Sequence, residues 1–398
     1  MEFSENRVVS RARFATAVFF FTNGAVMANL LPRLPELKRG FSLADDTYGV
    51  VVAAVPAGAI LAGLSAGWFA RRFGVSVVAA VGTAVTAGAL LLASLVPAVG
   101  LLVVCLALAG AADAVVDVAQ NSHGLEVQRL YGRSIINGFH AVWSIGAVCG
   151  GLMAASAVLL GVPLPWHLAV SGVLFAGLAL WAQRGCLPRS ACSTSSGEAS
   201  SSLGLAPMGG RGRLVTYSVL ATLVLVAVAG AMVEDLANSW ATLFLERDLQ
   251  APRFVSVLGF PVIVGAQFVG RLAGDSMVDR WGYRGVARFG AGLIAVGLGL
   301  VVAWPLVPVT LVGFAAAGFG SATLVPAAMH AADGLPYLRP GVGLTVVSWL
   351  MRLGFMLTAP MVGAIADLWS LRMGLGLVAV AGLVAVFLAG VLPGRDTK

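Results

Sequence analysis

Residues 270–282 read GRLAGDSMVDRWG, and residues 63–74 carry a shorter form of the same pattern, GLSAGWFARRFG. Each segment follows a long apolar stretch, and each combines glycines four residues apart with arginine just before the final residues. Small residues at this spacing let helices pack closely in lipid, and arginines are typical of the short loops between membrane-spanning helices. The repetition indicates a tandem duplication of one membrane-embedded unit.

Outward from these segments the chain is apolar almost throughout. Of its 398 residues 59% are hydrophobic and 11% are charged, whereas about a quarter of the residues in a soluble domain are charged. Because about 20 apolar residues in a helix cross a bilayer, each long apolar run predicts one crossing. The predicted spans are residues 13–32, 45–70, 75–95, 100–121, 137–160, 165–182, 214–244, 253–274, 286–304, 308–330, 342–365 and 371–392.

The Lys and Arg residues predict the orientation of these spans, because cationic loops stay on the cytoplasmic side. With the N-terminus inside, eighteen of them fall on inner segments and six on outer loops, and Arg352 is left within a span. Both termini are therefore predicted to be cytoplasmic, in the cell membrane. The same scatter of cations over short loops explains the net charge of +7 and argues against a nucleic-acid partner.

The segment from Pro188 to Arg213 is rich in Ser, Gly, Ala and Pro, which is typical of a flexible linker. It divides the chain into a predicted N-terminal six-helix bundle at 1–187, a cytoplasmic linker at 188–213 and a C-terminal six-helix bundle at 214–398. The predicted fold class is an all-α membrane protein with 12 transmembrane helices in two pseudo-symmetric bundles. A monomer suffices for this architecture.

Twelve spans, a central loop and the repeated glycine-arginine motif resemble the major facilitator superfamily over essentially the whole chain. The resemblance implies alternating access, with the motif acting in gating. The acidic position of the motif holds Asp279 in the second copy and Arg71 in the first, so the first copy departs from the pattern. As an alternative, these arginines serve only as topology anchors. The predicted gating residues are Gly67, Arg71, Arg72, Gly74, Gly274, Asp275, Asp279 and Arg280.

Four shorter stretches resemble the YbjJ-type proteins of the fucose-permease-like branch. They are PRLP at 32–35, DVAQN at 117–121, GFHAVWSIG at 138–146, and Glu234 with Trp240. In that branch an Asp commonly precedes the Trp, whereas Ser239 stands there in this chain. This resemblance implies proton symport of a sugar or a related small polar solute.

Ionisable side chains inside the spans predict the proton pathway, because each costs about 2.5–3.5 kcal/mol at the centre of a bilayer and must face inward. Asp113, Asp117 and Asn121 recur at four-residue spacing and so share one face of span four. Glu234 and Asn238 share a face of span seven in the same way. The predicted proton-coupling residues are Asp113, Glu234, Asp117 and His140. As the alternative, they are static polar groups that hold helices together.

Arg352 is a cation well inside span eleven, and its side chain cannot lose its proton. It therefore needs an anionic partner, for which Asp113, Glu234 or a substrate group qualifies. Amide groups and indole rings suit sugar hydroxyls and ring faces, although Trp240 could equally be an interfacial anchor. The predicted substrate-binding residues are Asn23, Met27, Asn121, Trp143, Asn238, Trp240 and Arg352.

Function follows from these residues and from motifs that the sequence lacks. The chain contains no Walker A motif, so protons are the expected energy source of a secondary transporter. It also lacks the H-E-x-x-H and G-x-S-x-G motifs of hydrolytic enzymes, and its scattered histidines predict neither a metal nor another cofactor. We predict proton-coupled symport of a sugar or a similar polar molecule, with proton-coupled export of a drug or metabolite as the alternative.

Overall fold

The computed structural model describes residues 2–131, 135–187, 210–335, 338 and 342–394. All secondary structure within these ranges is helical, as expected where lipid offers no hydrogen bonds to the backbone. Twelve helical segments are long and apolar enough to cross a membrane, and they confirm the predicted number of spans. They are Val8–Gly40, Asp45–Gly63, Val75–Ala93, Val99–Tyr131, Gly138–Leu159, Leu164–Gly185, Leu214–Ser239, Arg253–Gly274, Ser276–Ala303, Val307–Ala332, Val346–Leu368 and Leu371–Val391.

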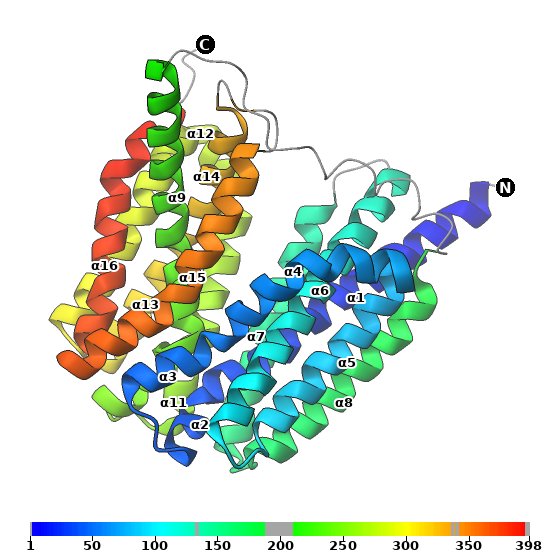
Figure 1. The fold of residues 1–398 in the computed structure, drawn as a ribbon, viewed down its shortest axis with the longest axis horizontal. Coiled ribbons are helices and arrows are strands. Elements are labelled where there is room, and N and C mark those ends of the chain that lie inside the picture. Colours follow the sequence, from blue (N-terminus) through cyan, green and yellow to red (C-terminus); the bar gives the residue numbers. More distant parts are fainter. Residues whose placement is uncertain (1, 132–134, 188–209, 336–337, 339–341, 395–398) are drawn as a thin grey trace. The chain divides into compact units, whose positions relative to one another are not determined.

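The described chain forms two compact units (Figure 1). Unit 1 contains residues 1–43, 50–199 and 253–261, and unit 2 contains residues 44–49, 200–252 and 262–398. Each unit thus includes a short piece of the other half of the sequence. Most of the predicted linker, residues 188–209, lies outside the described residues.

Unit 1 is a bundle in which α4 packs against α6, α5 packs against α6 and α8, and α1 packs against α7 and α8. The short helix α11, from the second half of the sequence, lies against α7. The elements are α1 (Glu2–Leu30), η1 (Leu31–Arg33), α2 (Leu34–Gly40), α4 (Ala54–Phe73), α5 (Val75–Ala93), α6 (Val99–Tyr131), α7 (Ile136–Leu159), α8 (Leu164–Ala182), η2 (Gln183–Gly185) and α11 (Arg253–Val257).

In unit 2, helix α9 lies against α13, α14, α15 and α16. Two elements cross the division between the units: α3 (Asp45–Val52) begins in unit 2, and α12 (Gly259–Ala303) begins in unit 1. The remaining elements are α9 (Gly210–Ser239), α10 (Ala241–Leu243), η3 (Phe244–Asp248), α13 (Val307–Ser321), α14 (Leu324–Asp333), α15 (Val342–Leu368), α16 (Leu371–Leu388) and η4 (Ala389–Val391).

The final glycine of each repeated motif has the same unusual backbone. Gly74 has φ 92° and ψ 141°, and it joins α4 to α5. Gly282 has φ 69° and ψ 166°, and it makes the sharp kink inside α12. A side chain disfavours positive φ, so glycine is favoured at both of these positions.

Close helix contacts account for several other glycines, as the small-residue spacing predicts. Helices α1 and α7 approach so closely that a Cβ atom at Gly24 would collide with the Trp143 carbonyl oxygen, and one at Gly146 would collide with that of Phe21. This packing places residues of α1 directly beside residues of α7, which matters for the site below.

Two helices differ from the predicted spans in ways that affect the site. The fourth span was predicted to end at residue 121, but α6 continues to Tyr131, so Asn121 stands within an unbroken helix. The seventh span was predicted as one helix over 214–244, but α9 ends at Ser239 and Trp240 separates it from α10.

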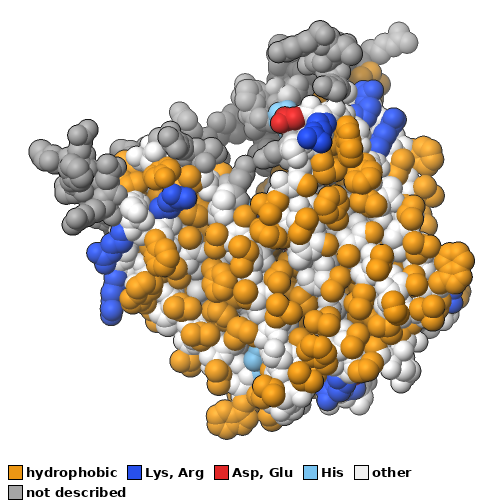
Figure 2. All heavy atoms as spheres, turned by 180° about the vertical axis from the view of Figure 1, so that it is seen from behind, with side chains coloured by type: hydrophobic (Ala, Val, Ile, Leu, Met, Phe, Trp, Pro, Cys, Tyr) orange, Lys and Arg blue, Asp and Glu red, His pale blue; other side chains and the backbone are white. Residues whose placement is uncertain are grey.

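Figure 2 shows hydrophobic side chains over most of the face in view, with Lys and Arg side chains near its edges.

Candidate proton and substrate site

Asn23 is the centre of a buried polar network in unit 1. It lies on α1, and only 7% of its surface is exposed. Its amide nitrogen Nδ2 donates to Asp113 Oδ1 of α6 at 2.7 Å. Its carbonyl oxygen Oδ1 accepts from Trp143 Nε1 of α7 at 2.9 Å and from Gln120 Nε2 of α6 at 3.3 Å. Three helices are therefore joined through one side chain.

Asp117 extends this network along α6. Its Oδ1 accepts from Gln120 Nε2 at 3.3 Å and from Asn121 Nδ2 at 2.9 Å. Asn121 Nδ2 also donates to the Asp117 backbone oxygen at 2.8 Å. The structure thus places Asp113, Asp117 and Asn121 in one connected set, as their four-residue spacing predicts.

The network contains two carboxyl groups, and no ion pair of the described residues includes either of them. Asp113 is held by a neutral amide instead of a cation. A carboxyl group in apolar surroundings without a cationic partner favours its neutral form. Chemically, this arrangement can take up a proton at Asp113 and transmit the change to helices α1 and α7 through Asn23.

Gln120 is a functional candidate that the sequence reasoning missed. It is fully buried, and its Oε1 atom has no hydrogen-bond partner among the described residues. The sequence spacing already indicates Gln120, because it lies three residues after Asp117 and seven after Asp113, which places it on the same helix face.

His140 and Met27 lie on the two helices that flank this network. His140 is exposed on α7, and its ring packs edge-on against Phe20 with ring centroids 5.2 Å apart. Its backbone oxygen accepts from Ser144 Oγ at 3.2 Å. Met27, one turn after Asn23 on α1, is half-buried. The side-chain hydrogen bonds of Asn23 among the described residues go to Asp113, Gln120 and Trp143, so the roles of His140 and Met27 remain predictions.

A second polar cluster in unit 1 explains the PRLP stretch. Arg33, with 3% of its side chain exposed, donates from Nε and Nη2 to the two carboxylate oxygens of Glu36, at 2.8 and 2.9 Å. It also donates to His167 Nδ1 at 3.1 Å and to the Val162 backbone oxygen at 3.0 Å. Arg253 lies 3.7 Å from Glu36. This network ties the end of the first span to the start of the sixth.

The predicted residues of span seven lie in unit 2, on or just after α9. Glu234 and Asn238 are half-buried, and Trp240 is fully buried. The Trp240 ring packs edge-on against Tyr48, with centroids 5.0 Å apart, and its Nε1 has no hydrogen-bond partner among the described residues. Trp240 is therefore a core side chain in this conformation.

Arg352 is exposed on α15, in unit 2. Helix α15 packs against α9, the helix that carries Glu234, but no ion pair of the described residues joins the two side chains. The predicted pairing of Arg352 therefore stays a prediction.

The repeated motif shows different side-chain arrangements in its two copies. In unit 1 the Arg71 guanidinium lies over Gly67, where an added Cβ would be 3.2 Å from Arg71 Nη1, and Arg72 lies over the Phe73 ring. In unit 2 Asp279 and Arg280 are both exposed, and an added Cβ at Gly274 would be 3.2 Å from Thr323. The side chain of Asp275 lies outside the described residues.

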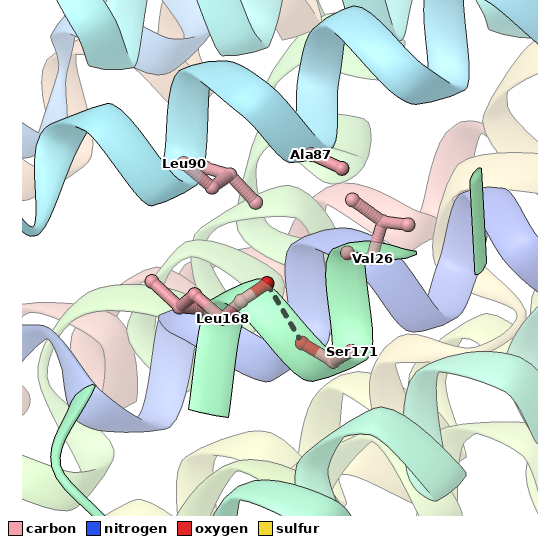
Figure 3. Close-up of a pocket in the computed structure, with 6 residues that line it drawn as sticks. Val26, Ala87, Leu90, Leu168 and Ser171 are labelled. Carbon is pink, nitrogen blue, oxygen red and sulfur yellow. Dashed lines mark hydrogen bonds between the residues drawn. The ribbon is translucent and has the colours of Figure 1, made fainter. Parts of the chain in front are cut away.

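A small pocket between α1, α5 and α8 of unit 1 is separate from the polar network (Figure 3). Its lining is aliphatic apart from Ser171, whose hydroxyl contacts the Leu168 backbone oxygen at 3.5 Å. A pocket with such a lining offers little to orient a polar solute. The lining residues are Val26, Ala87, Leu90, Leu168, Ser171 and Gly172.

Comparisons with known proteins agree with this architecture. No family model matches the chain. It is 28% identical over 380 residues to an uncharacterized transporter, y4wD, of Sinorhizobium fredii, covering 94% of this chain and 97% of that protein. It is 26% identical to an uncharacterized MFS-type transporter of Yersinia pestis, covering 92% of each chain.

Solved structures give the fold. A mutant of the nucleoside transporter NupG matches with a TM-score of 0.78 at 13% identity, over 95% of this chain and 99% of that one. The chain is a transporter with the major facilitator fold. A D-xylose-proton symporter also matches, with a TM-score of 0.69 at 14% identity, over 98% and 99% of the two chains. These relatives and neighbours are transporters and not enzymes, which confirms the predicted function class at this level.

Proposed function

We propose that this chain is a proton-coupled symporter that carries a sugar or a similar small polar solute across the cytoplasmic membrane. The observation that carries the proposal is the hydrogen bond from Asn23 to Asp113, at the centre of the network that joins α1, α6 and α7. A proton bound at Asp113 neutralises a carboxyl group that has no cationic partner among the described residues, and solute binding then uses the neutral form.

The same residues support a polar solute. Asn23, Gln120 and Asn121 are amides that can exchange hydrogen bonds with hydroxyl groups, and Trp143 offers a flat indole face. The likeness to a D-xylose-proton symporter and to a nucleoside transporter supports a sugar-containing substrate class. The fucose-permease-like motifs point in the same direction, and Arg352, Asn238 and Glu234 are the candidate contributors from unit 2.

Transport in liposomes tests the proposal. A thermal-shift screen of sugars and nucleosides with the purified protein selects a ligand, and its uptake is then measured with and without an imposed inward proton gradient. We expect the gradient to drive accumulation in the wild type, and we expect Asp113→Asn to exchange solute without accumulating it. Gradient-driven accumulation by Asp113→Asn would overturn the assignment.

Glu126→Gln is the matched control on the same helix. Glu126 lies near the end of α6 and pairs with the exposed Arg129 at 3.1 Å, so its loss should leave gradient-driven uptake intact. An Arg352→Ala variant tests the predicted role of the exposed cation, and uncoupled or absent uptake is the expected result. Proton-driven efflux from inverted vesicles, without uptake in right-side-out vesicles, would instead favour the export alternative.

A further inference from the structure

Asp235 of α9 is a buried carboxyl group that the proposed function does not use. Its exposed fraction is 2%, and its Oδ1 accepts a long hydrogen bond from Ser239 Oγ at 3.3 Å. Its other oxygen, Oδ2, is buried with no hydrogen-bond partner among the described residues. The ion pairs of the described chain do not include Asp235 either.

The segment 44–49 belongs to unit 2, although the rest of its span belongs to unit 1. Charged side chains of unit 2 hold this segment in place. Asp45 forms an ion pair with Arg247 at 2.5 Å, and the backbone amides of Asp45 and Asp46 donate to the carboxylate of Asp367 at 3.0 and 2.6 Å. A carboxylate there complements the exposed amides at the start of α3.

Tyr48 connects this docked segment to the end of α9. Its hydroxyl donates to the Ser239 backbone oxygen at 2.7 Å, at the point where α9 is interrupted. Its ring packs edge-on against Trp240, and only 1% of the residue is exposed. Ser239, whose backbone oxygen accepts from Tyr48, also donates from Oγ to Asp235 Oδ1, so one residue connects Asp235 to the docked segment.

The charged groups around Asp235 are mainly acidic. Glu234 precedes it on α9, and Asp45 lies on α3, whose Tyr48 hydroxyl donates to the Ser239 backbone oxygen. The cation that contacts segment 44–49 is Arg247, and it already forms ion pairs with Asp45 and Asp248. The helices packed on α9 add these ionisable groups: none on α13, His330 and Asp333 on α14, Arg352 and Asp367 on α15, and Arg372 on α16.

Four of those groups have other described surroundings, and the side chain of Asp333 lies outside the described residues. His330 stacks on Tyr283, Asp367 accepts the amides of α3, Arg372 donates to the Val302 and Ala303 backbone oxygens, and Arg352 is exposed. An ionised Asp235 would therefore be a desolvated anion among other anions. Burying such a charge without a partner is costly enough that the group takes up a proton instead.

We propose that Asp235 is a proton-binding positioning residue whose neutral form allows residues 44–49 to dock on α9, and whose ionisation releases them. The inference rests on the proposed function only for the origin of the proton gradient. Because α3 begins in this segment and ends in unit 1, release of the segment is transmitted along α3 to the start of α4. Proton occupancy in unit 2 thereby acts on a span shared by both units.

The test measures docking directly. Thr47→Cys and Gln250→Cys, both exposed, carry spin labels in full-length protein whose native cysteines are replaced by serine. Pulsed electron-electron double resonance then gives the distribution of distances between the two labels from acidic to alkaline pH. We expect a short distance at low pH and a longer one at high pH, with a ratio of populations that changes up to about tenfold per pH unit for one linked proton.

Variants assign the effect to Asp235. Asp235→Asn should stay docked at every pH, and Asp235→Glu should restore the dependence with a shifted midpoint. Glu234→Gln, one residue away, and Ser239→Ala, which keeps the carboxyl group, should both retain a pH-dependent distance. A wild-type distance that ignores pH, or an unchanged pH dependence in Asp235→Asn, would overturn the proposal.

The outcome is separable from that of the proposed function. Asp113→Asn should abolish proton-driven accumulation while leaving the pH-dependent distance in place. If the wild type shows pH-dependent docking but no proton-driven uptake, the symport proposal fails and the assignment of Asp235 stands. The reverse result rejects Asp235 alone.

Discussion

Asn23 and Asp113, ninety residues apart in the sequence, are joined by a 2.7 Å hydrogen bond between a neutral amide and a carboxyl group. The same amide receives hydrogen bonds from α6 and α7 through its carbonyl oxygen. One side chain of α1 therefore connects the Asp113 carboxyl group of α6 to α7. This relationship leads to the first prediction.

Replacing Asn23 with Leu should impair both transport and stability. The change leaves Asp113, Gln120 and Trp143 without their shared partner, and a buried polar group without a partner costs about 1–3 kcal/mol, equivalent to about a 5- to 150-fold change in an equilibrium. We expect gradient-driven uptake to fall at least about tenfold and the melting temperature in detergent to drop. Asn23→Asp, which keeps the acceptor and removes the donor, should impair coupling with a smaller loss of stability. Wild-type uptake by Asn23→Leu would contradict the network's role.

Replacing Arg33 with Met should destabilise unit 1. Arg33 is buried and makes a two-point ion pair with Glu36, and it also binds His167 and the Val162 carbonyl. Removing one member of a buried ion pair typically costs about 3–5 kcal/mol. Arg33→Lys should be intermediate, because an ammonium group cannot make the two-point contact. Thermal unfolding in detergent measures both, and equal melting temperatures for wild type and Arg33→Met would refute the prediction.

Replacing Gly74 or Gly282 with Ala should destabilise the inner turns. Both glycines have positive φ, where an added Cβ costs about 1–2 kcal/mol. Gly88→Ala on α5 is the matched control, because a Cβ there meets open space in a helix, where Ala gains about 0.5–1 kcal/mol over Gly. Chemical denaturation should rank Gly88→Ala as the most stable of the three. A stability of Gly74→Ala equal to that of the control would argue against strain.

Labelling of single cysteines should establish the orientation. Ala98 lies in a predicted outer loop and Arg129 near a predicted inner one, and both are exposed. In whole cells with native cysteines removed, Ala98→Cys should react with a membrane-impermeant maleimide and Arg129→Cys should react only after permeabilisation. The reverse pattern would place both termini outside, against the charge distribution of the loops.

The sequence predicted much of the candidate site, and its limits are specific. Four-residue spacing on one helix was enough to group Asp113, Asp117 and Asn121, because helical geometry alone puts such residues on one face. The same reasoning favoured Glu234 on α9, whereas the fully buried carboxyl is its neighbour Asp235. Periodicity cannot rank two adjacent residues when no partner helix is known.

By itself the sequence determined the twelve spans and the helical fold class, because in lipid a run of about 20 apolar residues can satisfy its backbone only as a helix. It also predicted short connections after the second and eighth spans, and the structure adds that Gly74 and Gly282 have positive φ there. Only the tertiary structure decided that Asn23 holds Asp113, and that Tyr48 docks against the end of α9. Those contacts join residues far apart in the chain, and their existence depends on which helix faces pack together, which no local pattern specifies.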